Sequence, residues 1–65
     1  MRPYRCYFLD AHGLIKDIRV VVCDGDREVD RIASDLLAEH PQLSSVEIWS
    51  RSRRVGLLAA DPNHA

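Results

Sequence analysis

The sequence predicts a small α+β domain, in which one amphipathic helix packs on one face of a four-stranded, mainly antiparallel sheet. Two short β-type segments precede residues 24–40 and two more follow them. Residues 24–40 carry an apolar stripe with helical spacing. The expected order is therefore ββαββ, two hairpins joined by one helix, with the order of strands in the sheet left open.

The first predicted hairpin joins an aromatic-rich strand over residues 4–9 to a β-branched segment over residues 14–23. A three-residue loop, residues 11–13, suits the connection between these two strands. Gly13 can take the left-handed conformation that ends such a loop, and Asp10 is favoured just before the turn. Asp10 then faces Leu14.

This loop fixes a register for the hairpin. On one face it pairs Tyr4 with Val20, Cys6 with Ile18 and Phe8 with Lys16. On the other face it pairs Arg5 with Arg19, Tyr7 with Asp17 and Leu9 with Ile15. The first set is the more apolar, so we assign it to the core.

The helix is predicted from Val29, Ile32, Ala33, Leu36 and Leu37, which recur at the spacing of one helical face. Asp24 or Asp26 is expected to cap its beginning. Pro41 is expected to end it, since the residue before a proline avoids helical geometry.

The second hairpin is predicted over residues 45–50 and 54–59. Val46 and Ile48 share the core face with Val55 and Leu57, and Trp49 faces Arg54. A two-residue loop would consist of Arg51 and Ser52. Such a loop uses a type I′ or II′ turn with positive φ, for which arginine and serine are poorly suited. We therefore expect a four-residue loop over residues 50–53.

Residues 1–60 are expected to form a single domain and residues 61–65 a disordered tail. No apolar run reaches the length of a membrane span and the beginning lacks the features of a signal peptide, so we expect a cytoplasmic, soluble protein with reduced cysteines. The net charge is −1. Residues 24–47 carry seven acidic side chains against two basic ones, whereas both flanking segments are basic.

One helix covers one face of the sheet, so the opposite face is predicted to meet water or a partner. The predicted registers place on it Arg5, Tyr7, Leu9, Ile15, Asp17, Arg19, Val21, Glu47, Trp49, Arg54 and Leu58. Apolar area of this kind on a small domain is typical of a contact surface. The candidate interaction residues are Arg5, Tyr7, Leu9, Arg19, Val21, Trp49 and Arg54.

Three interpretations of this face compete. The first is a homodimer or another protein partner, since aromatic residues and arginine are enriched at interfaces. The second is nucleic-acid binding, with Tyr7 and Trp49 as stacking surfaces and the arginines on phosphates. The third is a plain surface, on which Arg54 covers Trp49 in a cation–π pair worth about 0.5–1 kcal/mol. The acidic balance and the absence of an RNA-binding motif rank nucleic acid last, below a protein partner and below a plain surface.

An enzyme is not expected. The serines lie in no nucleophile elbow, no glycine-rich phosphate loop is present, and the histidines are scattered. No two types of metal ligand share a metal-site spacing, so neither a metal nor a cofactor is predicted.

The stretch Tyr-Arg-Cys-Tyr-Phe-Leu-Asp-Ala-His-Gly, the helix ending in Leu-Leu-Ala-Glu-His-Pro and the Val-Glu-Ile-Trp strand resemble a group of short proteobacterial proteins of unknown function. Those proteins share a strand–Asp-x-x-Gly–strand–helix–strand outline over nearly their whole length, and the resemblance covers residues 4–58 here. The group implies no activity. The order is also similar to that of HicB-type antitoxins, which implies a partner-neutralising role. A separate DNA-binding segment of that family has no counterpart here, which argues against a repressor.

Overall fold

The computed structural model describes residues 1–60. Along the chain it contains β1 (Arg2–Leu9), β2 (Ile15–Cys23), α1 (Asp26–Ala38), β3 (Ser45–Ser50) and β4 (Arg53–Ala59). The predicted α+β class and the ββαββ order are confirmed. The predicted tail, residues 61–65, lies outside the described residues.

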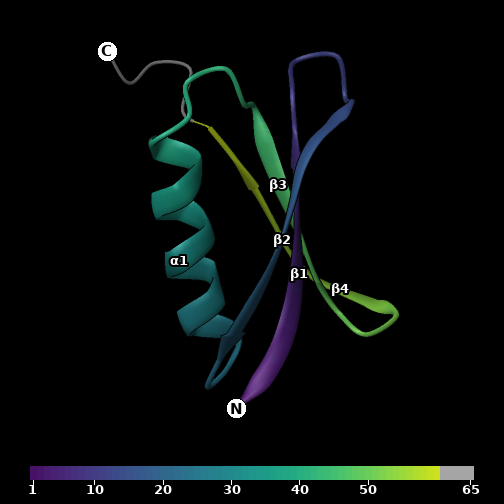
Figure 1. Ribbon diagram of the computed structural model, residues 1–65, viewed down its shortest axis with the longest axis vertical. Helices are drawn as coiled ribbons and strands as arrows, with labels where there is room; N and C mark the ends of the chain where they lie inside the picture. The colour runs from purple at the N-terminus through teal and green to yellow at the C-terminus, as the bar shows by residue number, and fades with distance from the viewer. Residues whose placement is uncertain (61–65) are drawn as a thin grey trace.

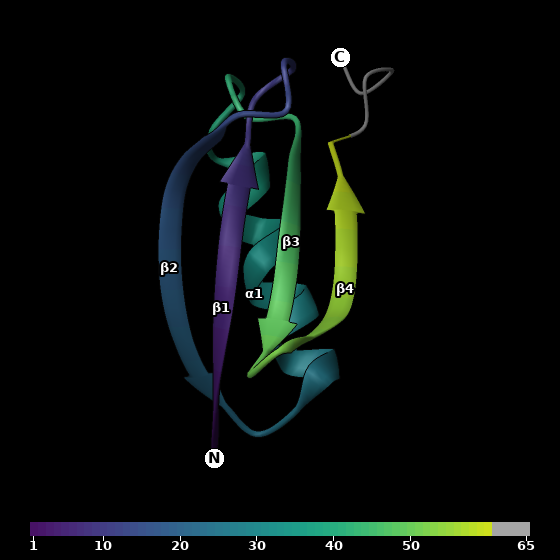
Figure 2. The same ribbon diagram turned by 90° about the vertical axis from the view of Figure 1, so that its right-hand side faces the viewer.

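The four strands form one antiparallel sheet in the order β2-β1-β3-β4. Figure 2 shows this order from left to right, with α1 behind the sheet, and Figure 1 shows the same two layers from the side. β1 and β3 are central, so β2 and β4 are the two edges. The face away from α1, which we call the open face, carries no other element of the described chain.

The core lies between α1 and the two central strands. α1 contributes Val29, Ala33 and Leu37, the buried part of the predicted stripe, while Ile32 and Leu36 pack at its margin. The sheet side is supplied mainly by alternate residues of the central strands. The buried side chains of this side are Tyr4, Cys6 and Phe8 from β1, Cys23 from β2, and Val46 and Ile48 from β3.

The turn between β1 and β2 forms as its residues predict. Gly13 takes φ 79°. One carboxylate oxygen of Asp10 accepts hydrogen bonds from the backbone N–H of His12 at 2.8 Å and of Leu14 at 3.0 Å. The backbone N–H of Asp10 donates a 2.9 Å hydrogen bond to the carbonyl of Leu14, and the carbonyl of Asp10 accepts a 3.0 Å hydrogen bond from the backbone N–H of Gly13. A short acidic side chain and a glycine therefore close this loop together.

The predicted register of this hairpin is wrong beyond the first pair. Leu9 pairs with Ile15 as expected, but Phe8 pairs with Asp17, which leaves Lys16 as an extra residue in β2. Because side chains alternate between faces, this bulge exchanges the two faces of the rest of β2. Asp17, Arg19, Val21 and Cys23 lie on the helix side, and Ile18, Val20 and Val22 lie on the open face.

The beginning of α1 also differs from the prediction. Gly25 occupies the N-cap, and neither Asp24 nor Asp26 caps the helix with its side chain. Instead Glu28 in the first turn reaches back, and its carboxylate accepts a 3.0 Å hydrogen bond from the backbone N–H of Asp24. The first turn is acidic, as the helix dipole favours.

The second hairpin has a two-residue loop rather than the predicted four-residue one. Ser50 pairs with Arg53, and Arg51 takes φ 60°, the only positive φ of a non-glycine residue within residues 1–60. The predicted pair of Trp49 and Arg54 is confirmed.

A bulge at Val55 follows in β4, because the partner of Ile48 is Gly56. A Cβ on Gly56 would lie 3.2 Å from Cδ1 of Ile48 and 3.3 Å from Oδ1 of Asp30, so glycine allows α1 to approach β4 closely.

Candidate interaction face

The open face is built from alternate residues of all four strands, and five of the seven predicted interaction residues lie on it. Register pairs Arg5 with Trp49, Tyr7 with Glu47 and Leu9 with Ser45, and Arg54 continues the row of Trp49. The sheet therefore brings Arg5, Tyr7, Leu9, Trp49 and Arg54 to one side.

Arg19 and Val21 are placed on the wrong side by the prediction. Arg19 pairs with Cys6 and Val21 with Tyr4, whose side chains are buried under α1. Val21 is half-buried and packs against the core. Asp17 and Leu58 are likewise on the helix side, since their partners are the buried Phe8 and Val46. The bulge at Lys16 accounts for the β2 residues, and the bulge at Val55 accounts for Leu58.

The residues that replace them on the open face are large and apolar. Ile18, Val20 and Val22 of β2 are 56%, 65% and 56% exposed, and Leu57 of β4 is 57% exposed. Hydrophobic patterning could not have found the β2 residues, because they form the more apolar half of the strand and patterning assigns that half to the core. Only the position of the bulge reverses this assignment.

The charges on and beside the open face are arranged without the conflict that the predicted register implied. Arg5 faces Val20 rather than Arg19. Arg19 is on the other side of the strand, where its Nε lies 3.1 Å from a carboxylate oxygen of Asp17. The open face itself carries Arg5, Arg54 and Glu47, so both signs of charge are present on it.

Trp49 is held in place by its neighbour on the same strand. Its indole N–H donates a 3.1 Å hydrogen bond to a carboxylate oxygen of Glu47. A half-buried tryptophan with a fixed orientation between Arg5 and Arg54 is an amphipathic anchor of the kind found at interfaces.

Both cysteines of the chain lie in the core rather than on the open face. Burial raises the pKa of the Cys6 thiol, and the nearby Cys23 raises it further, so Cys6 is protonated rather than a ready nucleophile. Both cysteines are free and buried. Residues 1–60 contain no group of three or more histidine, cysteine or acidic side chains that could hold a metal ion.

The helix of the described chain is too short and too polar to cross a membrane. Comparison of the chain with protein-family models, with curated proteins and with solved structures finds no match.

Proposed function

We propose that the protein is a non-catalytic, self-associating module whose open face packs against the open face of a second copy. One observation carries the proposal. Of the seven large hydrophobic side chains that are exposed within residues 1–60, five lie on the open face: Ile15, Ile18, Val20, Val22 and Leu57. Tyr7, Leu9 and Trp49 lie between them and are only half-buried.

The size of the domain supports association. A chain of about 60 residues buries only about 60% of the surface that it exposes when unfolded, so its single core gives marginal stability. Stacking two sheets about 10 Å apart would remove the open-face side chains from water. The result would be a four-layer arrangement with the helices outside and both sheets inside.

The charges of the open face favour a second copy as the occupant. A two-fold contact presents the same patch from both sides, so it must be self-complementary. Arg5 and Arg54 provide positive charge and Glu47 provides negative charge on that patch. Each copy can therefore offer a carboxylate to an arginine of the other.

The test is the oligomeric state, measured by light scattering or sedimentation equilibrium over a concentration series. We expect the mass to rise from 7.4 kDa toward twice that value as concentration increases. Val20→Lys and Leu57→Lys should each keep the protein monomeric, because association would then have to bury the charged lysine side chain in the contact between the two copies. Neither should unfold it, since both side chains are more than half exposed.

Leu14→Lys is the matched control, because Leu14 is 58% exposed but lies in the β1–β2 turn rather than on the open face. It should associate like the wild type. A mass that stays at 7.4 kDa at all concentrations contradicts the proposal. If Val20→Lys dissociates the dimer and Leu57→Lys does not, the copies pair along the β2 edge and face-to-face stacking is wrong.

A further inference from the structure

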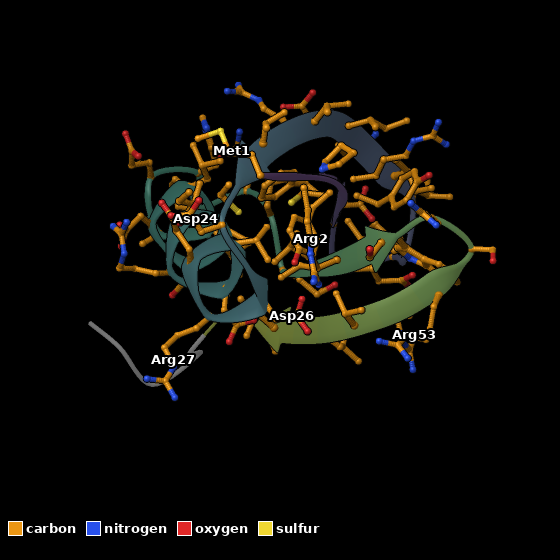
Figure 3. The ribbon with its side chains drawn as sticks, turned by 90° about the horizontal axis from the view of Figure 1, so that it is seen from below. Met1, Arg2, Asp24, Asp26, Arg27 and Arg53 are labelled. Carbon is orange, nitrogen blue, oxygen red and sulfur yellow. The ribbon has the colours of Figure 1, made fainter. Side chains whose placement is uncertain are left out.

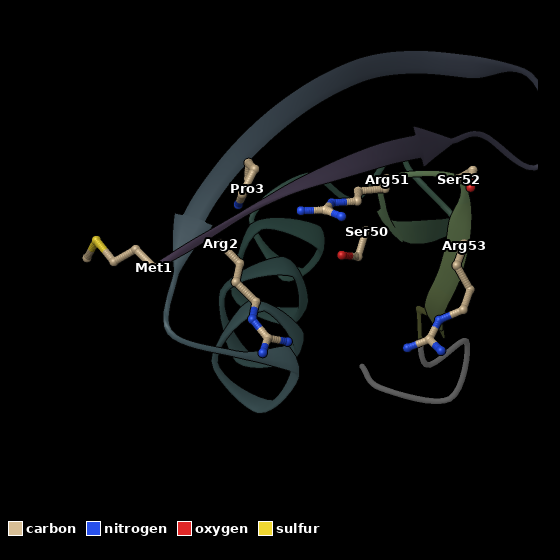
Figure 4. A pocket seen from close by; sticks show the side chains of 7 residues that line it. All are labelled: Met1, Arg2, Pro3, Ser50, Arg51, Ser52 and Arg53. Carbon is tan, nitrogen blue, oxygen red and sulfur yellow. The ribbon is translucent and has the colours of Figure 1, made fainter.

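A second surface lies at the end of the sheet and is separate from the open face. There the beginning of β1 and the β3–β4 hairpin enclose a groove of about 560 Å³. Figure 4 shows the side chains of Arg51 and Ser50 between those of Arg2 and Arg53. The groove is lined by Met1, Arg2, Pro3, Ser50, Arg51, Ser52 and Arg53.

The lining is positively charged and contains no acidic residue. The ion pairs within residues 1–60 involve Lys16, Arg19 and Arg31, so none of the groove's three arginines lies within 4.0 Å of a described carboxylate. Figure 3 shows the acidic beginning of α1 at the same end of the molecule. Asp26 there accepts a hydrogen bond from the hydroxyl of Tyr4 and does not line the groove, although Arg2 lies close enough to that hydroxyl to lower its pKa. Three guanidinium groups that face one space repel one another unless an anion lies between them.

The backbone gives an independent reason to assign a role to this end. Arg51 is held at φ 60° in a two-residue loop, where glycine or asparagine would avoid the steric cost of about 1–2 kcal/mol. A two-residue loop requires positive φ here, and rare backbone conformations of this kind also cluster at binding sites. In this loop the conformation places an arginine, and Figure 4 shows that side chain directed across the groove toward Pro3 and Arg2.

We propose that this groove binds the phosphate group of a phosphorylated ligand. Arginine is the side chain best suited to this, because its planar fork donates two parallel hydrogen bonds to phosphate oxygens. The hydroxyls of Ser50 and Ser52 add neutral donors. The groove exceeds the volume of one phosphate and lies in the size range of small-molecule sites. The phosphate can therefore belong to a mononucleotide-sized molecule or to a nucleic-acid backbone.

The test is a series of NMR titrations at low ionic strength with inorganic phosphate, a nucleoside monophosphate and a short single-stranded oligonucleotide. We expect saturable shifts at the backbone amides of residues 50–53 and at the Arg2 side chain. If the natural source is a small molecule, the monophosphate should bind at least as tightly as the oligonucleotide. If it is a nucleic-acid backbone, the oligonucleotide should bind more tightly. Three phosphate contacts would then give a slope of log K against log salt of about −2.

Two neighbouring arginines provide a matched pair of variants. Arg53 lines the groove, whereas Arg54 lies on the open face opposite Trp49. Arg53→Gln should weaken phosphate binding at least about tenfold, and Arg54→Gln less than about twofold, although both remove one charge. Amide spectra of both variants should keep the wild-type dispersion, since both residues are exposed. Equal losses in the two variants, or no saturable shift in any titration, would overturn the proposal.

Discussion

The hydroxyl of Tyr4 donates a 2.6 Å hydrogen bond to Oδ1 of Asp26, which joins the central strand β1 to the first residue of α1. Tyr4 is 1% exposed, so its ring belongs to the core while its hydroxyl reaches the helix. Gly25 provides no side-chain cap. The bond therefore attaches the beginning of the helix to the sheet next to an N-cap residue that has no side chain of its own to offer.

Loss of this bond should be visible in the dependence of stability on pH. The hydrogen bond to Asp26, followed by burial, raises the pKa of Tyr4 above its ordinary value of 10.0. Because the pKa is raised, the stability that the Tyr4 hydroxyl contributes is complete below the ordinary pKa and is lost as pH rises through the folded-state pKa. Tyr4→Phe should lower the denaturation midpoint at neutral pH and flatten the alkaline decline. Tyr7→Phe is the control for loss of a tyrosine hydroxyl, because none of the side-chain hydrogen bonds found within residues 1–60 involves Tyr7, and it should lower the midpoint less than Tyr4→Phe does.

Gly25→Ser should stabilise the helix. Gly25 has an extended backbone, φ −176°, which serine adopts without strain, and no atom beyond its chain neighbours lies within 4 Å of a Cβ built there. Serine adds a side-chain acceptor for the first turn and reduces the entropy of the unfolded chain, so the free energy of unfolding should rise by about 0.5–1 kcal/mol. Gly25→Ala separates the two effects, because it keeps the entropic part alone. Urea denaturation of all three proteins measures both; a serine variant no more stable than the alanine variant would rule out the cap.

Arg51→Gly should make the protein more stable by roughly 1 kcal/mol, because glycine takes positive φ without the steric cost that arginine bears. The same change should weaken phosphate binding. Ser52→Gly should instead lower stability, since Ser52 has no positive φ to relieve and glycine only adds entropy to the unfolded chain. Thermal denaturation compares the three proteins, and a destabilised Arg51→Gly variant would show that Arg51 is not strained.

Acid should loosen the β1–β2 turn as the carboxylate of Asp10 takes up a proton. The hydrogen bonds from the backbone of Leu14 and of His12, together with Lys16, lower the pKa of Asp10 below its ordinary value of 3.8. A carboxylate whose pKa is lowered by folding contributes stability above its ordinary pKa, and this stability is lost as pH falls through the folded-state pKa. The amide shifts of His12 and Leu14 should therefore titrate together below pH 3.8. A midpoint above that value would contradict the turn geometry.

The sequence predictions were correct where the signal came from residues that are close together in the sequence. The helix stripe and the turn made by Asp10 and Gly13 depend on residues close in sequence, and both are confirmed. The face of β2 depends on one extra residue, Lys16, and no local pattern shows where a strand takes up an extra residue. The strained turn at Arg51 was missed because its conformation opposes the preference of its residue. The groove between β1 and the β3–β4 hairpin needed the strand order, which the sequence left open.

Deletion of Lys16 tests this account of the register directly. Lys16 is the residue that β2 carries in excess of its partner, so its removal should restore a regular ladder in which Ile15 still faces Leu9 and Asp17 still faces Phe8. Its ion pair with Asp10 is long, at 3.7 Å, and surface pairs contribute only about 0–1 kcal/mol. The free energy of unfolding should therefore change by no more than about 1 kcal/mol.

Deletion of Ile18 is the matched control for this prediction. It removes a residue from the regular part of the ladder, so either Asp17 or Arg19 must change face and the hairpin must lose stability by more than the Lys16 deletion does. Cross-strand nuclear Overhauser effects between Phe8 and Asp17 should survive the Lys16 deletion. The Lys16 deletion could instead adopt the register predicted from the sequence, in which Ile18 lies opposite Cys6. In that case hydrophobic patterning, rather than the bulge, determines which face of β2 is buried. Val20 would then move under α1, and the open face would lose the side chains on which self-association depends.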